Sequence, residues 1–104
     1  MRLSNQQRHD LVEALKQIFP TTKGSLFIYG SRAQDHLKGG DIDLCFILES
    51  DVDTQNLQEK IVPFLMAAKK RLGEQKIDFS IISKMESLHD PFWKTALLHS
   101  ALLT

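Results

Sequence analysis

The sequence is centred on residues 25–48, which read SLFIYGSRAQDHLKGGDIDLCFIL. An apolar run over residues 26–29 stops at Gly30, and a short polar segment follows it. A second apolar run comes next, and it is opened by Asp41 and Asp43. This order predicts a strand, a turn that binds phosphate, a short helix, and a second strand that carries two acidic side chains.

Asp41 and Asp43 share one face of the predicted strand, because successive side chains of a strand point to opposite faces. The two residues lie about 6.7 Å apart in an extended chain, so their carboxylates can meet around one ion. Without a cation, two like charges about 6 Å apart repel by about 3 kcal/mol at an effective dielectric constant of about 20. Acidic residues are also disfavoured in strands. The pair therefore predicts a divalent metal held by carboxylate oxygens.

A third carboxylate lies in residues 76–82, which read KIDFSII and predict another strand. Asp78 shares a face with Ser80, and the apolar side chains of this strand point to the opposite face. If this strand pairs beside the strand of Asp41 and Asp43, the three carboxylates converge. Three carboxylates near a phosphate-binding turn are typical of two-metal phosphoryl or nucleotidyl transfer.

These motifs resemble those of the DNA polymerase β-type nucleotidyltransferase superfamily: Gly30-Ser31, then Asp41-Ile42-Asp43, then Asp78 on a later strand. The segments Gly-Ser-Arg-Ala and Gly-Asp-Ile-Asp-Leu are similar to its minimal nucleotidyltransferase (MNT) branch in particular. The resemblance implies an α/β fold with a polymerase β-like core, in which helices pack against a small mixed sheet of three or four strands. Residues 1–104 would then form a single minimal nucleotidyltransferase domain.

The resemblance also implies a role for each motif residue. Nucleotidyl transfer in this family uses two Mg²⁺ ions, ATP as the substrate, and carboxylates that are both catalytic residues and metal ligands, here Asp41, Asp43 and Asp78. The expected nucleotide-binding residues are Gly30, Ser31 and Arg32. For Arg32, a surface position or a salt bridge to Asp35 is an alternative to phosphate binding. The loop before Asp41 is slightly shorter than is usual in the family, and Asp35 stands where many relatives carry glycine.

Short stand-alone MNT proteins resemble antitoxins that are paired with HEPN-domain toxins. In those systems the MNT protein transfers AMP from ATP to a toxin tyrosine. The resemblance therefore implies AMPylation of a toxin that is encoded nearby. One alternative is transfer to a small molecule, as in aminoglycoside nucleotidyltransferases. Another is an inactive homologue that neutralises or scaffolds a partner by contact alone.

The composition carries no global charge bias. The 104 residues include 13 basic and 13 acidic side chains, so the formal net charge is zero and nucleic acid is not the expected partner. No apolar run reaches the roughly 18 residues that span a membrane, and polar residues 6–10 interrupt any signal-peptide pattern. The lone Cys45 cannot form an internal disulfide and is expected to be a small buried residue. These features predict a cytoplasmic protein.

Helices are expected on both sides of the motif region. Ser4 and Gln7 have capping-box spacing at the start of a predicted helix over residues 4–19. A second helix is predicted over residues 54–72, where the apolar side chains recur at helical spacing. Pro63 lies inside this helix and predicts a kink or a break near it.

The C-terminal residues predict a helix with an extensive apolar surface. A short turn capped by Ser83 and Glu86 precedes it. Asp90 followed by Pro91 is a helix start, and apolar side chains continue from there to Leu103. They cover more than one narrow stripe of the helix. They therefore indicate either a surface for a partner or a second copy, or ordinary core packing.

Overall fold

The structure is a computed structural model that describes residues 3–33, 40–50 and 54–104. The segment Gly30–Ala33 forms a short 3-10 helix, η1, directly after the first strand. The predicted short helix is described only for this turn. The remainder of the polar segment, including Asp35, and the acidic residues at positions 51 and 53 lie outside the described residues.

Four strands form a mixed sheet in the order β3-β2-β1-β4. The two central strands, β1 (Gly24–Tyr29) and β2 (Ile42–Leu48), are antiparallel. On the outside, β3 (Ile77–Ile82) is parallel to β2, and β4 (Ala101–Leu102) is antiparallel to β1. Parallel neighbours need a crossover connection, which helices supply between β2 and β3. The predicted α/β fold with a small mixed sheet is confirmed.

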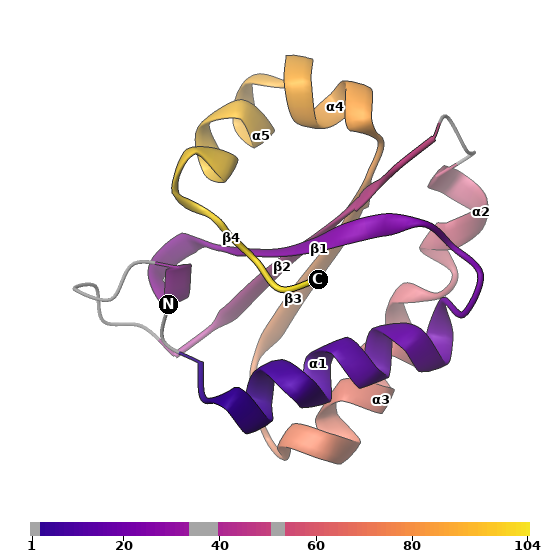
Figure 1. The fold of residues 1–104 in the computed structure, drawn as a ribbon, viewed down its shortest axis with the longest axis vertical. Helices are drawn as coiled ribbons and strands as arrows, with labels where there is room; N and C mark the ends of the chain where they lie inside the picture. The colour runs from indigo at the N-terminus through magenta and orange to yellow at the C-terminus, as the bar shows by residue number, and fades with distance from the viewer. Residues whose placement is uncertain (1–2, 34–39, 51–53) are drawn as a thin grey trace.

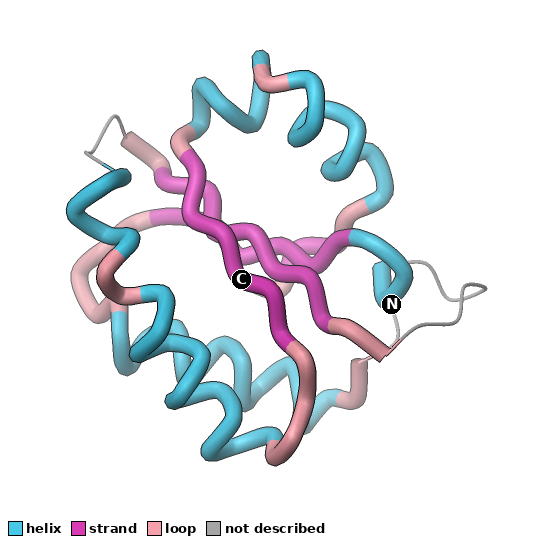
Figure 2. Tube along the Cα trace, turned by 180° about the vertical axis from the view of Figure 1, so that it is seen from behind, coloured by secondary structure: helices cyan, strands magenta, loops and turns pink. Residues whose placement is uncertain are grey.

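Helices cover both faces of the sheet, as Figure 1 and Figure 2 show from opposite sides. On one face, α1 (Asn5–Ile18) and α3 (Ile61–Leu72) pack together, whereas α4 (Lys84–His89) and α5 (Pro91–Ala96) lie on the other. The short α2 (Thr54–Gln58) lies beside β3, where its last side chain donates a hydrogen bond to the Ile81 carbonyl. Among the described residues, every helix is too short or too polar to cross a membrane.

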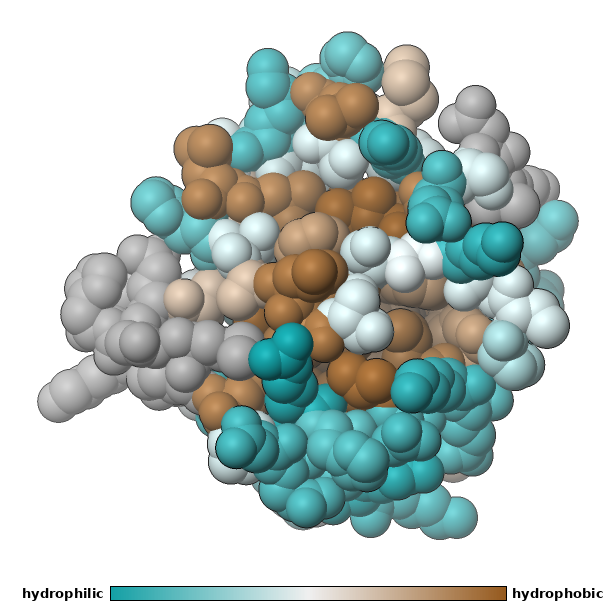
Figure 3. All heavy atoms as spheres, viewed as in Figure 1, coloured by the Kyte–Doolittle hydropathy of each residue, from teal (hydrophilic) through white to brown (hydrophobic). Residues whose placement is uncertain are grey.

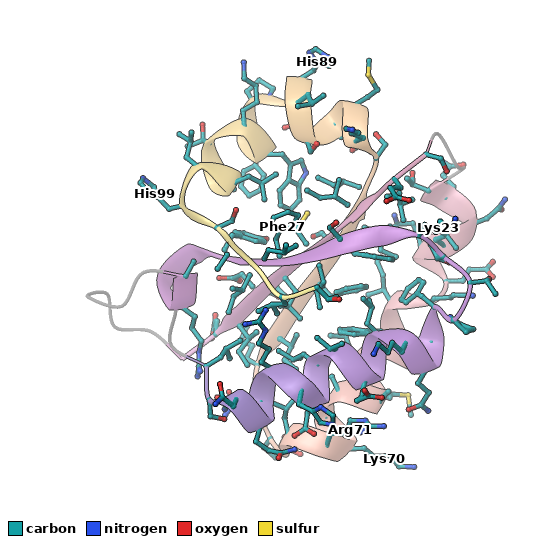
Figure 4. All side chains as sticks on the ribbon, in the orientation of Figure 1. Lys23, Phe27, Lys70, Arg71, His89 and His99 are labelled. Atoms are coloured by element: carbon teal, nitrogen blue, oxygen red, sulfur yellow. The ribbon has the colours of Figure 1, made fainter. Side chains whose placement is uncertain are left out.

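Strand alternation separates an apolar face of the sheet from a mixed face. The apolar face packs on α1 and α3, and its completely or almost completely buried side chains include Leu26, Ile28, Leu44 and Phe46. The mixed face carries Asp43 and Asp78, and Figure 4 shows Phe27 on this side, toward the α4–α5 layer. Cys45 is buried here as predicted, and burial raises the pKa of its thiol to about 12. The acidic side chains thereby avoid the apolar core, where an unpaired charge is costly.

The helices on the apolar face follow their local sequence signals. Ser4 Oγ accepts a hydrogen bond from Gln7 N at 3.0 Å, and Gln7 Oε1 accepts one from Ser4 N, so the capping box of α1 is confirmed. The predicted helix over residues 54–72 is broken at residues 59–60, which separate α2 from α3. Pro63 lies in the first turn of α3, where its missing N–H removes no hydrogen bond within the helix.

The C-terminal helix is shorter than predicted, and its expected extension to Leu103 is wrong. Helix α5 ends at Ala96, a 3-10 turn η2 (Leu97–His99) follows, and the chain then adds β4 to the sheet. Leu103 N donates a hydrogen bond to Leu26 O at 2.7 Å, and the Leu103 side chain is buried in the core. The edge of β1 therefore forms hydrogen bonds with the backbone N–H and C=O groups of the last residues. A longer helix would have paired these groups within itself.

Candidate active site

The predicted acidic residues lie at the end of the sheet where β1 ends and β2 and β3 begin, and Figure 1 shows how these strand ends are arranged. The strand register pairs Asp43 with Tyr29 on β1 and with Asp78 on β3. Neighbouring strands lie about 4.8 Å apart, so the three side chains form a row across the mixed face. The prediction that the strand of Asp78 pairs beside the strand of Asp43 is confirmed.

Asp43 and Asp78 are register partners on adjacent strands, close enough for a hydrogen bond between their carboxyl groups to affect the pKa of Asp43. Burial, this hydrogen bond and repulsion from Asp78 raise the pKa of Asp43 above its ordinary value, and repulsion from Asp41 adds to them. The positive charge of Lys76 acts in the opposite direction. A carboxyl group whose ionised form is disfavoured in this way is stabilised in that form by a bound cation.

Asp41 lies one residue before β2, and its carboxylate faces a lysine. Asp41 Oδ2 is 3.5 Å from Lys76 Nζ, and both side chains are exposed. Within the described parts of the chain, no three His, Cys, Asp or Glu side chains lie close enough together to hold a metal ion. The structure thus joins Asp43 to Asp78 and leaves Asp41 beside them. The roles of all three as catalytic metal ligands stay predictions.

Gly30 brings the backbone directly against the carboxylate of Asp43. Its φ angle is +73°, in the left-handed region that favours glycine. A Cβ atom built at this position would lie 2.5 Å from Asp43 Oδ2, which is closer than real Cβ atoms approach. Glycine therefore allows the turn from β1 into η1 and the close approach to Asp43 at the same time.

Arg32 connects η1 to the segments that precede β2 and β3. Its Nη2 atom donates hydrogen bonds to Gly40 O at 3.1 Å and to Gln75 Oε1 at 3.5 Å. These contacts hold the guanidinium close to the residue before Asp41. Its phosphate contact stays a prediction, and so does that of Ser31, for which the structure describes the backbone turn alone. The alternative partner of Arg32, Asp35, lies outside the described residues.

A family model for the nucleotidyltransferase domain matches residues 9–101, which is most of the chain. The chain belongs to the nucleotidyltransferase domain family. The match agrees with the superfamily resemblance expected from the sequence motifs, and the matched region includes Gly30, Asp43 and Asp78. The protein is thus a nucleotidyltransferase at the level of its family, and such domains generally use a nucleoside triphosphate and a divalent metal.

Two solved structures share the fold of this nucleotidyltransferase domain. A protein from Sulfolobus solfataricus, assigned as a nucleotidyltransferase, is 16% identical with a TM-score of 0.53, and the alignment covers 98% of this chain and 89% of that one. A second protein with the same assignment is 19% identical with a TM-score of 0.56, over 92% of this chain and 96% of that one. At these identities the likeness concerns the fold alone. No curated protein matches the sequence.

The carboxylates of this nucleotidyltransferase domain fit the divalent metal that the family generally uses. Oxygen atoms of carboxylates are the ligands that Mg²⁺ prefers in proteins. Burial, first of all, and the neighbouring carboxyl groups raise the pKa of Asp43, so its ionised form is disfavoured in the protein alone. A divalent cation would supply compensating positive charge. Asp43 and Asp78, with Asp41 next to them, are therefore suitable residues to hold it.

Tyr29 belongs to this site although the sequence motifs gave it no separate role. Burial raises its pKa to about 12, repulsion from Asp43 adds to the rise, and a hydrogen bond with the Ser80 side chain opposes it. The Tyr29 ring meets Trp93 of α5 edge-on, with ring centroids 5.4 Å apart. Tyr29 directly precedes Gly30, so strand alternation together with the turn could have placed it on the acidic face.

Lys76 is the second residue of the site that had no predicted role. It lies two positions before Asp78, so the alternation of an extended chain places both side chains on the same face. Its backbone is also fixed, because Ile42 N donates a hydrogen bond to Lys76 O at 2.9 Å. The sequence signal that could have placed Lys76 in the site was a basic residue two positions before an acidic residue of a predicted strand.

The alkaline titration of Tyr29 tests the environment of the site. Tyr29 is the only tyrosine in the chain, so tyrosinate absorbance reports this position alone. We expect a native pKa of about 12, against an ordinary value of 10.0, and a lower value in Asp43→Asn, which loses one repulsive charge. Because folding raises the pKa of Tyr29, its protonated phenol stabilises the folded protein. This stabilisation is fully present below pH 10.0 and is lost as the pH rises through about 12.

A stopped-flow pH jump would measure the tyrosinate absorbance before the protein unfolds in alkali. Asp10→Asn on α1 is the control, because Asp10 lies on the helical layer that packs against the opposite face of the sheet. A native pKa near 10.0 for wild-type Tyr29 would contradict the burial of its phenol beside Asp43.

Proposed function

We propose that this nucleotidyltransferase domain belongs to the MNT branch and transfers AMP from ATP, with Mg²⁺, to a tyrosine hydroxyl of a HEPN-type toxin. The protein would act as the antitoxin, and its toxin would be encoded nearby. The observation that carries the transferase part is the contact of Asp43 with Asp78 on adjacent parallel strands, directly against the backbone of Gly30. The acceptor part rests on the motif resemblance and on the surface described below.

Each site residue has a role in the proposed reaction. Asp41, Asp43 and Asp78 would hold two Mg²⁺ ions, and Gly30 and Ser31 would bind the triphosphate through their backbone N–H groups. When bound, the ions neutralise the charge that develops on the phosphates during transfer. Arg32 would add a further positive charge beside the nucleotide.

The transfer itself is a single displacement at the α-phosphorus of ATP. The acceptor hydroxyl oxygen forms a bond to this phosphorus, the bond to the bridging oxygen of the β-phosphate breaks, and pyrophosphate leaves. The hydroxyl proton passes to Asp78. Asp78 suits this role better than Asp43, because Asp78 is exposed on the outer strand β3 and Asp43 is flanked by Tyr29 and Asp78.

An exposed apolar surface beside the site supports a protein as the acceptor. Its members are more than half exposed and come from α4, α5, η2 and β4: Met85, Leu88, Phe92, Leu98 and Leu102. Figure 3 shows apolar side chains over this part of the molecule and hydrophilic ones over α1. Phe92 meets Trp93 edge-on at 4.9 Å, and Trp93 contacts Tyr29, so the surface reaches the site. The same surface could join two copies of the chain.

The basic residues of α3 do not point to a nucleic-acid acceptor. Figure 4 shows Lys70 and Arg71 on the side of α1 and α3, directed away from the sheet. They lie on the opposite side of the sheet from the α4–α5 layer that flanks the site. With a formal net charge of zero, the chain also lacks a global field that attracts nucleic acid. We place the reaction in the cytoplasm, in agreement with the single unpaired cysteine.

A small-molecule acceptor gains no support from the cavity that described residues line on the mixed face. A cavity of about 350 Å³ lies on the mixed face, and its lining includes Ser25, Ile47 and Lys84. Ile47 lies four residues along β2 from Asp43, which is about 13 Å in a strand. A small acceptor in this cavity would therefore be far from the carboxylates. The contact-only module remains the second candidate, because the described residues hold no preformed group of three metal ligands.

Labelling of a cell lysate tests the proposed function. The protein is added to a lysate of its source cells with Mg²⁺ and ATP labelled on the α-phosphate, and labelled proteins are separated on a gel. We expect one labelled band, which disappears with Asp43→Asn or with EDTA and which mass spectrometry identifies as a small toxin modified by AMP on tyrosine. Full neutralisation of the toxin by Asp43→Asn would instead favour the contact-only module.

A further inference from the structure

Lys76 occupies a position between the start of β2 and the start of β3. Its backbone carbonyl accepts a hydrogen bond from Ile42 N at 2.9 Å, which fixes the residue beside Asp41. Its ammonium is 3.5 Å from Asp41 Oδ2, and 72% of its side chain is exposed. The lysine thus reaches a carboxylate of the site while its stem stays in solvent.

The charge balance of the site makes this contact significant. Three carboxylates belong to the site, and the charge of Lys76 lowers the pKa of Asp43 against the effects of burial and of Asp78. The neighbouring guanidinium of Arg32 is directed to Gly40 O and Gln75 Oε1. Lys76 therefore provides positive charge directly at the acidic group in the protein alone.

We propose that Lys76 is a positioning residue, which holds Asp41 before substrate binds and moves to the phosphates of the nucleotide when a divalent cation takes Asp41. This inference rests on the proposed metal-dependent transfer. A divalent cation that takes Asp41 Oδ2 displaces the ammonium from this oxygen, so the ion pair then opens. Exposed ion pairs contribute little to stability, and a lysine ammonium is a mobile point charge. The exchange is therefore easy, and the ion pair keeps a positive charge beside the acidic residues until a cation binds.

Binding measurements on Lys76→Met test this inference without the transfer reaction. Calorimetry would give the affinity for Mn²⁺ in the absence of nucleotide, and for ATP in the presence of the metal. We expect Mn²⁺ to bind roughly fivefold more tightly to Lys76→Met, because a competing positive charge is gone, and ATP to bind roughly tenfold more weakly. Lys76→Arg should restore ATP binding. In an Asp41→Asn background, Lys76→Met should no longer tighten Mn²⁺ binding.

Lys16→Met is the matched control, because Lys16 forms a comparable exposed ion pair with Glu13 on α1, at 3.8 Å. It should change neither affinity. Equal Mn²⁺ and ATP affinities for wild type and Lys76→Met would overturn the inference and leave Lys76 as an ordinary surface lysine. If wild type binds no Mn²⁺, both the inference and the metal-dependent function fail. If the expected shifts occur but no protein in the lysate is labelled, Lys76 is supported and the proposed acceptor is overturned.

Discussion

Asp43→Asn is expected to abolish nucleotidyl transfer and to make the metal-free protein more stable. Asparagine keeps the shape of the side chain but loses the charge that would hold a divalent cation. Changing a group that merely supports a metal ligand lowers metal affinity or activity about 10–100-fold. Loss of the ligand itself should therefore lower the rate on the order of 10³-fold or more. Incorporation of labelled AMP into the acceptor measures the rate, and circular dichroism verifies that the fold is kept.

The gain in stability follows from the raised pKa of Asp43. Burial, the hydrogen bond with Asp78 and repulsion from Asp78 disfavour the ionised carboxylate in the folded protein. A carboxyl group whose pKa is raised by folding stabilises the folded protein in its protonated form. This stabilisation is present below the pKa of the unfolded chain, near 3.8, and is lost as the pH rises through the pKa of the folded protein. The substituted asparagine cannot ionise, so the variant should have a higher melting temperature than wild type at pH 7, and the difference should vanish in acid.

Asp10→Asn is the matched control for this prediction. Asp10 lies on α1, where its Oδ1 atom accepts a hydrogen bond from Gln6 Nε2 at 2.9 Å. This variant removes the same charge on the opposite side of the sheet and should leave both the rate and the response to Mg²⁺ unchanged. Addition of Mg²⁺ should raise the melting temperature of wild type and of Asp10→Asn but not of Asp43→Asn. A fully active Asp43→Asn protein would exclude Asp43 as an essential metal ligand.

Gly30→Ala is expected to cause the second large loss of activity, through displacement of a carboxylate by one methyl group. The new Cβ atom would lie 2.5 Å from Asp43 Oδ2, so either the carboxylate or the turn must shift. The left-handed backbone adds a cost of about 1–2 kcal/mol for a residue with a Cβ atom. Transfer should fall by at least about 10²-fold, because a misplacement of about 1 Å in a catalytic site is sufficient for that.

Gly73→Ala separates the two causes of this loss. Gly73 ends α3 with a φ angle of +83°, similar to that of Gly30, but no atom lies within 4 Å of a Cβ atom built there. Both variants should lose roughly 1–3 kcal/mol of stability from the positive-φ backbone alone, which is roughly 4–8 °C in melting temperature per kcal/mol for a domain of this size. Only Gly30→Ala should also lose transfer activity and Mg²⁺-induced stabilisation. Equal activity in both variants would show that the approach of Gly30 to Asp43 is not required.

Local chemistry in the sequence was sufficient for most of the secondary structure. Ser4 with Gln7, and Ser83 with Glu86, form the capping boxes that their spacing predicted, and Asp90 accepts hydrogen bonds from backbone N–H groups at the start of α5. These interactions join residues two to three positions apart, so a short sequence window contains both partners. The apolar runs of residues 26–29 and 44–48 and the segment 76–82 likewise predicted β1, β2 and β3.

The acidic motifs gave the composition of the site, and the sheet register gave its arrangement. The sequence predicted that the carboxylates share a face, because alternation within one strand is a local property. The pairing of Asp43 with Asp78 depends on β3 lying parallel and next to β2, which a crossover through α2 and α3 makes possible. The ion pair of Asp41 with Lys76 depends on the same register, so neither contact could be derived from spacing alone.

The C-terminal segment shows the opposite case, in which local pattern and tertiary structure disagree. The apolar side chains after Ala96 are compatible with a helix, but Ala101 and Leu102 pair with β1, and Leu103 enters the core. The sequence by itself determined the first three strands, the helix caps and the acidic residues of this nucleotidyltransferase, because each depends on neighbours in the chain. Only the tertiary structure decided which carboxylates touch, what Gly30 approaches and where the last residues lie, because these contacts join residues far apart in the chain.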